Sequence, residues 1–271
     1  MGDVVEADAA KQRIRQIWGM GDYSHLSRRL EPAARELADA CAVSAGQEVL
    51  DVAAGDGNFA LACAREGASV VASDFAPGMV ESGRARSERE GYEIEWIEAD
   101  AEELPFEDAR FDCVGSVFGG MIAPDPQRMA GELFRVVRAG NTVGLTAWVP
   151  DGIFAQMFAI GRRYAPPAPG AARSEQWGDE EVVRERLAGL AATVSCERRR
   201  LTWTADSPAA LEAELVETAP TYAAARESLD ADAYAELCRE TLELIERHNV
   251  ARDGTLRLDA EYLLTVARKR G

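Results

Sequence analysis

The protein has 271 residues, of which 47% are hydrophobic, so it is long enough to form one large domain, or a domain with a cap, around a sizeable core. Its formal net charge of −17 would repel a phosphate backbone, and we therefore expect no nucleic-acid partner. The sequence shows no signal peptide and no apolar run long enough to span a bilayer, so we expect a cytoplasmic protein without a membrane segment. The five cysteines do not have the spacing of a metal site, and we expect no metal.

Helices are the first elements that the sequence predicts, over residues 9–41. Ile14, Ile17 and Trp18 recur at helical spacing, a glycine-rich break follows at 19–22, and the helical pattern then resumes. We expect residues 1–44 to form an N-terminal helical arm.

Strands alternate with helices from residue 48 onward. The expected strands are 48–53, 69–73, 93–98, 111–117 and 142–148. The expected helices between them are 57–66, 77–90 and 126–138. This alternation predicts a parallel sheet with crossover helices on both faces.

The pattern changes after Trp148. The proline-rich segment 165–172 cannot be regular structure and predicts a loop over the carboxyl edge of the sheet. Further elements are expected as a helix at 179–190, a strand at 192–204, a helical region from 207 to about 249 and a strand at 260–269.

These elements divide the chain into four parts. We expect the arm at 1–44, a core at 45–206 with a lid loop near 150–178, an inserted helical cap at 207–250 and a final edge strand at 251–271. The fold class is therefore α/β, with a Rossmann-like sheet of seven strands that is mostly parallel and has an antiparallel edge strand.

A glycine-containing turn follows the first strand, in the segment VLDVAAGDGN at 49–58. Gly55 and Gly57 would let the backbone approach a ligand at the carboxyl edge of the sheet. The spacing of Gly55, Gly57 and Ala60 also fits a dinucleotide fingerprint, so the turn alone leaves NAD(P) open as the ligand.

Acidic residues favour a different cofactor. Asp51 and Asp56 would repel a pyrophosphate, but they suit S-adenosylmethionine (SAM), which has no phosphate and carries an amino group and a sulfonium. Asp74 ends the second strand, where a carboxylate can accept hydrogen bonds from the ribose hydroxyls of either cofactor. Asp100 and Ala101 follow the third strand, where a carboxylate and a backbone N–H can bind adenine.

Five segments resemble the motifs of class I SAM-dependent methyltransferases, with the character of small-molecule enzymes related to the ubiquinone and menaquinone biosynthesis methyltransferases. They are LDVAAGDGN at 50–58, SDF at 73–75, DAEELPF at 100–106, RFDCVGSV at 110–117 and ELFRVVRAG at 132–140. The resemblance is strong over 45–148. The family's first motif is Asp-x-Gly-x-Gly-x-Gly, whereas this chain has Ala53 and Asn58 at the first and last glycine. Ala53 implies a slightly less intimate backbone contact, and neither departure prevents binding.

The resemblance also implies a set of site residues. Asp74 would bind the ribose, Asp100 and Ala101 the adenine, and the turn 53–57 the methionine half of SAM. Ser116, Val117 and Phe118 would line the reaction chamber. The expected cofactor contacts are Tyr23, Asp51, Ala53, Gly55, Gly57, Asn58, Asp74, Phe75, Met79, Asp100, Ala101, Ser116 and Val117.

The break in the arm places Tyr23 and His25 in a segment that could fold over SAM as a lid. Methyl transfer requires alignment of donor and acceptor in a dry pocket and, for a protonated nucleophile, a base. The candidates for that base are His25, Tyr23, Tyr164, Tyr222 and Glu217, and the sequence does not choose among them.

We therefore expect methyl transfer from SAM, leaving S-adenosylhomocysteine, to oxygen, nitrogen or carbon of a small natural-product-like or quinone-like acceptor. Two alternatives stay open, an NAD(P)-dependent oxidoreductase and a SAM-binding protein without catalysis. The sequence is compatible with a homodimer.

Overall fold

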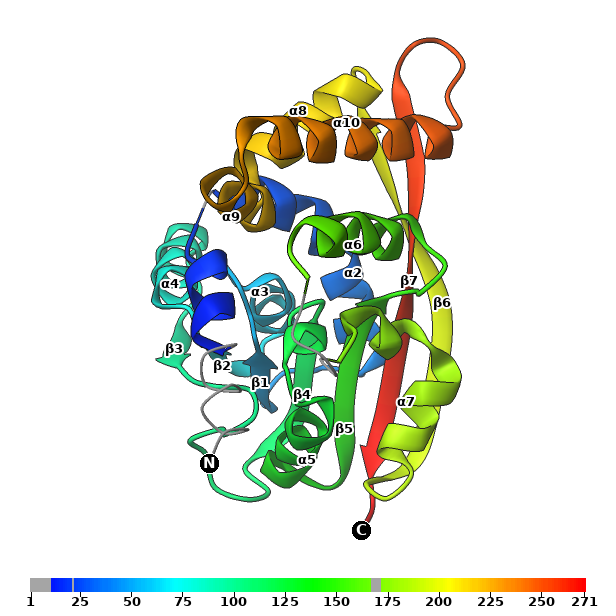
Figure 1. The fold of residues 1–271 in the computed structure, drawn as a ribbon. Coiled ribbons are helices and arrows are strands. Elements are labelled where there is room, and N and C mark those ends of the chain that lie inside the picture. Colours follow the sequence, from blue (N-terminus) through cyan, green and yellow to red (C-terminus); the bar gives the residue numbers. More distant parts are fainter. Residues whose placement is uncertain (1–10, 21, 167–171) are drawn as a thin grey trace, which may run out of the picture.

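The computed structural model describes residues 11–20, 22–166 and 172–271 (Figure 1). Residues 11–18 are helical and precede helix α2 (Ser24–Ala40), which agrees with two helices separated by a break. The start of the arm, Gly21 in the break and residues 167–171 of the expected lid loop lie outside the described residues.

Seven strands form one mixed sheet in the order β3-β2-β1-β4-β5-β7-β6. They are β1 (Glu48–Val52), β2 (Ser69–Asp74), β3 (Ile94–Glu98), β4 (Phe111–Val117), β5 (Val137–Trp148), β6 (Ala191–Ala205) and β7 (Leu256–Lys269). Strands β1 to β5 are parallel to one another, and β7 is antiparallel to both β5 and β6. The predicted seven-stranded, mostly parallel Rossmann-like sheet is confirmed.

The position expected for the last strand is wrong, because β6 and not β7 lies at the edge. Strand β7 buries a continuous apolar run that includes Tyr262, Leu263 and Leu264. Strand β6 instead carries the arginines at 198–200, and charged side chains of this kind are typical of an exposed edge.

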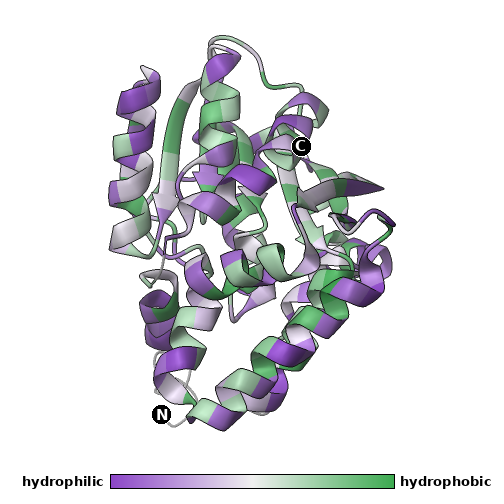
Figure 2. Cartoon of the chain, turned by 90° about the horizontal axis from the view of Figure 1, so that it is seen from above, coloured by the Kyte–Doolittle hydropathy of each residue, from purple (hydrophilic) through white to green (hydrophobic). Residues whose placement is uncertain are grey.

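Helices cover both faces of the sheet. Helices α2, α3 (Asn58–Arg65) and α4 (Pro77–Glu90) lie on one face, and α5 (Pro126–Val136) and α7 (Glu180–Leu187) lie on the other (Figure 1). The helices carry bands of hydrophobic residues beside hydrophilic ones, as amphipathic helices that pack on a core do (Figure 2). Within the described part of the chain, no helix combines the length and the hydrophobicity that a membrane span requires.

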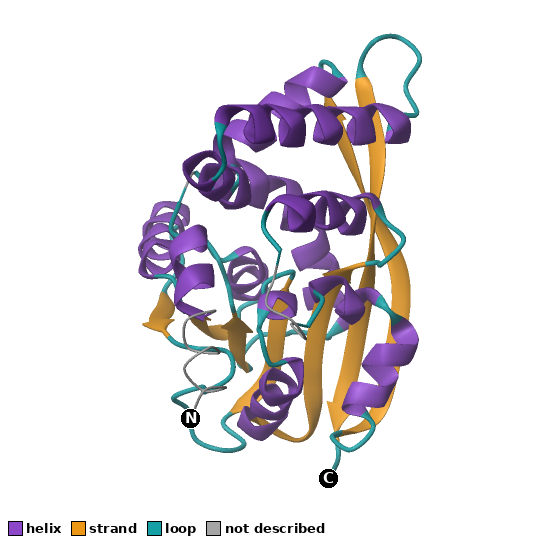
Figure 3. Ribbon diagram, in the orientation of Figure 1, coloured by secondary structure: helices purple, strands orange, loops and turns teal. Residues whose placement is uncertain are grey.

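A group of helices lies beyond the carboxyl ends of the parallel strands, where β6 and β7 extend toward it (Figure 3). Its members are α6 (Ile153–Tyr164), α8 (Pro208–Thr218), α9 (Pro220–Ser228) and α10 (Ala231–His248). Helices α8, α9 and α10 fall between β6 and β7 in the chain. The bidentate pair of Arg29 with Glu214, at 2.6 and 2.8 Å, joins α8 to α2 of the arm.

Helix α6 was not expected, since the sequence predicted a lid loop near 150–178. That prediction is wrong for the stretch Ile153–Tyr164, where Ile153, Phe154 and Ile160 form a buried stripe at helical spacing. A short helix, η2 (Ser174–Gly178), covers the end of β5. The proline-rich run therefore separates two helical segments.

Candidate active site

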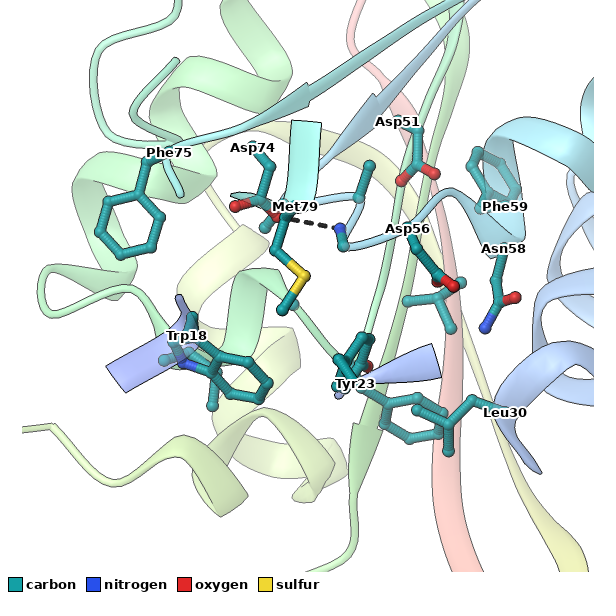
Figure 4. Close-up of a pocket in the computed structure, with 17 residues that line it drawn as sticks. Trp18, Tyr23, Leu30, Asp51, Asp56, Asn58, Phe59, Asp74, Phe75 and Met79 are labelled. Carbon is teal, nitrogen blue, oxygen red and sulfur yellow. Dashed lines mark hydrogen bonds between the residues drawn. The ribbon is translucent and has the colours of Figure 1, made fainter. Parts of the chain in front are cut away.

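A cavity opens at the carboxyl ends of β1, β2 and β4, beneath the N-terminal arm (Figure 4). Its lining combines acidic, apolar and small residues from five segments of the chain. These residues are Trp18, Tyr23, Leu30, Asp51, Ala53, Ala54, Gly55, Asp56, Asn58, Phe59, Asp74, Phe75, Met79, Val117, Phe118, Gly119 and Ile122. Open α/β sheets place their ligands at this edge.

Two strained loops meet at the floor of the cavity. Ala53 has φ +52° and Phe118 has φ +57°, both in the left-handed region that costs a non-glycine residue about 1–2 kcal/mol. Gly119 lies against the backbone of Ala53, because a Cβ on Gly119 would be only 2.1 Å from the Ala53 carbonyl oxygen. Strain of this kind persists where the surrounding structure fixes it, which is common at functional sites.

Asp51 leaves one polar atom of the cavity without a partner. Its Oδ2 accepts a hydrogen bond from the Ala60 N–H at 2.8 Å, whereas its Oδ1 is buried and has no partner. Burial raises the pKa of Asp51 to about 8, and the nearby carboxylates of Asp74 and Asp56 add to the shift. A ligand with a positive charge and N–H donors would favour the ionised form of Asp51 and give its Oδ1 a partner.

Asp74 links the end of β2 to the glycine turn. Its carboxylate accepts the Gly55 N–H and the Ala76 N–H, each at 2.9 Å, and the first of these bonds is drawn in Figure 4. Burial raises the pKa of Asp74 to about 6, although the two backbone bonds oppose the shift. A carboxylate has about four acceptor positions, so Asp74 keeps capacity for further donors.

The charge of the cavity lining has one sign. Asp51, Asp56 and Asp74 line it, and no lysine, arginine or histidine does so among the residues that the structure describes. Such a lining would repel a pyrophosphate and attract a cation. The residues present therefore fit SAM, with its sulfonium and amino group, better than a dinucleotide.

Tyr23 of the arm covers the glycine turn, and Trp18 of the arm packs against Tyr23. Trp18 and Tyr23 pack edge to face with ring centroids 5.6 Å apart, and a Cβ on Gly55 would lie 3.1 Å from Cε1 of Tyr23. Burial raises the pKa of the Tyr23 phenol well above its usual value, and the cavity acids raise it further. The phenol therefore stays protonated at neutral pH.

Four of the expected cofactor contacts do not line the cavity. Gly57 instead begins α3 with φ +94°, and the Ser116 hydroxyl donates to the Val52 carbonyl at 2.6 Å and accepts the Gly120 N–H at 2.8 Å. Asp100 and Ala101 lie outside it as well, after β3, where Asp100 forms an ion pair with Lys11. The other nine expected contacts all line the cavity.

An aromatic stack supports the wall at the end of β4. Phe118 lies on Trp148 with ring centroids 4.0 Å apart, and Trp148 lies on Phe154 at 4.1 Å. Tyr262 closes the stack edge-on from β7. Phe118 is the member of this stack that reaches the cavity.

Of the candidate bases, only Tyr23 lines the cavity. His25 and Glu217 are exposed, and Tyr164 is the last residue of α6. The Tyr222 hydroxyl lies 2.6 Å from the Thr241 hydroxyl, within the cap. The structure thus brings no second candidate base to the cavity.

Several lining residues were missed from the sequence. They are Trp18, Leu30, Phe59, Gly119 and Ile122. Trp18 and Leu30 belong to apolar helical stripes, and a stripe that faces a ligand has the same spacing as one that faces the core. Ala54 and Asp56 lie in the turn 53–57, which was expected to bind the methionine half of SAM, and both line the cavity.

Comparisons with known proteins agree with this geometry. Residues 49–140 match the family described as methyltransferase domain. The chain is 37% identical over 199 residues to an uncharacterized protein of Mycobacterium tuberculosis, an alignment that covers 73% of each chain. It is 32% identical over 179 residues to the demethylmenaquinone methyltransferase of Thermus thermophilus, which covers 63% of this chain and 81% of that relative. Among solved structures, a candidate methyltransferase from Bacillus halodurans has a similar fold, with a TM-score of 0.60, 23% identity, and coverage of 88% of this chain and 99% of that chain.

Proposed function

The chain belongs to the class I SAM-dependent methyltransferases, and we propose that it transfers the methyl group of SAM to a small-molecule acceptor in the cavity beneath the arm. This membership decides against the oxidoreductase alternative. The observation that carries the proposal is the cavity with three carboxylates and no cationic side chain among the described residues.

We assign the cofactor contacts by position. Asp74 would accept the ribose hydroxyls, because its carboxylate keeps free acceptor positions at the end of β2. Asp51 would receive the cationic methionine end through its unpaired Oδ1. Phe75 and Met79 would contact the adenine, and the backbone of the turn 53–57 the methionine chain.

SAM, when bound, supplies both the methyl group and its leaving group, so the protein has chiefly to align the acceptor and exclude water. Tyr23 of the arm covers the glycine turn and Trp18 packs on Tyr23, so the two would exclude water as a lid. Because the Tyr23 phenol stays protonated, it would not remove a proton from the acceptor, and its ring would serve as part of this lid.

The acceptor side of the cavity is apolar. Leu30, Val117, Phe118 and Ile122 form this wall, and the aromatic stack behind Phe118 fixes it. These side chains favour an acceptor with an apolar, flat body, which includes the quinone-like and natural-product-like classes. The name of the Thermus relative supports the quinone-like class.

Calorimetric titration with SAM and S-adenosylhomocysteine tests the cofactor assignment, and we expect both to bind. Incubation with methyl-labelled SAM and a panel of phenols, hydroquinones and amines then tests the reaction, with transfer of label as the expected result. Failure to bind either nucleoside would refute the assignment. Binding without label transfer across the panel would instead favour a SAM-binding protein without catalysis.

A further inference from the structure

A buried arginine, Arg86 of α4, contacts the glycine turn from behind the cavity and is only 6% exposed. Its Nη1 lies 3.1 Å from Oδ2 of Asp56 and donates to Oδ1 of Asn58 at 2.8 Å. Its Nη2 donates to Oε1 of Glu31, on α2, at 2.8 Å. One guanidinium therefore joins the glycine turn to the arm.

Ser27 of α2 completes this network. It is fully buried; its hydroxyl donates to Oδ1 of Asp56, and its carbonyl accepts the Asn58 side-chain amide at 2.8 Å. Nη1 of Arg86 also lies 3.3 Å from the Ser27 hydroxyl. Both carboxylate oxygens of Asp56 are thus held, one from the arm and one from α4.

Arg86 is the cation that pairs with Asp56, and the other ionisable groups nearby are acidic. Asp51, Asp74 and Tyr23 share the cavity with it, and Glu31 and Glu90 lie on the far side of the guanidinium. Burial raises the pKa of Asp56, and Arg86 is the largest influence that opposes the rise. A buried carboxyl that lost this partner would take up a proton more readily.

We propose that Arg86 is a positioning residue of the cofactor site, which holds the Asp56 carboxylate fixed and ionised on the cavity wall so that it attracts the cationic end of SAM. This inference rests on the proposed function, since it takes SAM as the ligand. Arg86 does not line the cavity and acts through Asp56.

A structural role alone would also weaken SAM binding when Arg86 is replaced, but it would do so equally at every pH. The pH profile therefore separates the two roles. In Arg86→Met, Asp56 should become neutral as the pH falls, so the variant should lose affinity toward acid pH faster than the wild type does. Arg86→Lys keeps a cation beside Asp56 and should restore most of the wild-type profile.

The experiment measures the Kd for SAM by calorimetry at pH 8.5 and pH 6.5. The ratio of the Arg86→Met Kd to the wild-type Kd should grow about three- to tenfold between these values, while the ratio for Arg86→Lys stays nearly constant. The double variant Asp56→Asn/Arg86→Met has no carboxyl to titrate, so its ratio should also stay constant. A constant ratio for Arg86→Met would overturn the proposal.

Arg86→Met leaves buried acids without a partner and can fail to fold, so a second variant also decides. Asp56→Asn keeps a hydrogen-bonding group of the same shape beside Arg86 and Ser27, and it should bind SAM about fivefold or more weakly at both pH values. Wild-type affinity in this variant would overturn the proposal. Failure of the wild-type protein to bind SAM would instead refute the proposed function.

Discussion

Lys11 of the arm forms an ion pair with Asp100 of the loop after β3, with 2.6 Å between Nζ and Oδ2. The same Nζ lies 2.6 Å from Oε2 of Glu102, and Oδ1 of Asp100 accepts the Glu102 N–H at 2.8 Å. The carboxylate expected to accept the adenine amino group is therefore bound by a cation of the chain itself.

Release of this ion pair should precede recognition of adenine by Asp100. We expect Lys11→Met to lower the Kd for SAM about three- to tenfold and to raise the association rate, because the carboxylate no longer has to be freed. Stopped-flow fluorescence of Trp18, which lies in the same helix of the arm, measures both quantities.

Lys269 is the one other lysine of the chain and provides a matched control. Its ammonium donates to the carbonyl of Val137, the first residue of β5, at 2.8 Å. This end of β5 is the one away from the cavity, so Lys269→Met should leave SAM binding unchanged. Weaker binding by Lys11→Met would contradict the expectation and would mean that the ion pair persists around bound SAM.

Asp74→Ala should weaken SAM binding by about 1–3 kcal/mol, roughly 5- to 150-fold in Kd. The substitution removes the carboxylate that would accept the ribose hydroxyls and that accepts the Gly55 N–H. Asp125 is the matched control, since its carboxylate also accepts two backbone N–H groups but does so at the start of α5. Asp125→Ala should cost about 1 kcal/mol of stability and leave the Kd unchanged. Equal losses of affinity in the two variants would show that Asp74 acts only on stability.

Asp51→Asn should change how stability depends on pH. The folded protein retains a proton on Asp51 up to about pH 8, whereas the unfolded chain releases it near the ordinary pKa of 3.8, so wild-type stability falls as the pH rises through this window. Asparagine does not titrate. The free energy of unfolding of the variant relative to wild type should therefore increase from pH 5 to pH 8, by as much as ~4 kcal/mol.

Urea unfolding of both proteins at pH 5, 6.5 and 8 measures this difference. A difference that does not change with pH would mean that Asp51 is ionised in the folded protein at all three values. Asp51→Asn should also bind SAM more weakly than the wild type does, since the substitution removes the acceptor oxygen that has no partner.

Phe118→Leu and Phe154→Leu separate packing from acceptor positioning. The two phenylalanines are similarly buried, 7% and 9% exposed, and stack on opposite sides of Trp148, but only Phe118 lines the cavity. Each substitution should cost about 1 kcal/mol of stability. The turnover rate should fall at least severalfold in Phe118→Leu and stay near wild type in Phe154→Leu, as measured with any acceptor that the panel identifies. Equal rates in the two variants would remove Phe118 from the acceptor site.

Tyr23→Phe should retain most of the turnover rate, because the phenol has a raised pKa and cannot act as a base at neutral pH. Tyr23→Ala opens the cover over Gly55 and should lower the rate much further by admitting water. Single-turnover measurements on both variants test this, and an equally large loss in Tyr23→Phe would restore the phenol as a catalytic group.

The position of the candidate site could be predicted because it follows from local patterns. Asp74 is the last residue of its strand and Asp51 is the last but one, and parallel strands end at one edge of a sheet, so two strand assignments predicted that the carboxylates lie close together. The contact of Lys11 with Asp100 joins residues 89 positions apart, and nothing in either segment marks it.

The errors have physical causes as well. The prolines at 166 and 167 favoured the prediction of a loop for the whole stretch 150–178, although helix α6 ends before them at Tyr164. Strand β6 lies at the edge because β7 pairs with both β5 and β6. The partners of strands more than 50 residues apart cannot be read from the hydrophobic pattern of either strand.

The place of β7 in the sheet has a consequence for biosynthesis. It comes after the other six strands in the chain, yet it lies between two of them. The parallel half of the sheet can assemble as soon as residues 48–148 have left the ribosome, but β6 has no partner until β7 follows it. Because α8, α9 and α10 connect these two strands, the helices beyond the cavity reach their final place only when β7 inserts. The described residues that line the cavity all fall between Trp18 and Ile122 in the chain, so a nascent chain contains the whole lining before Tyr262 of β7 closes the aromatic stack behind Phe118.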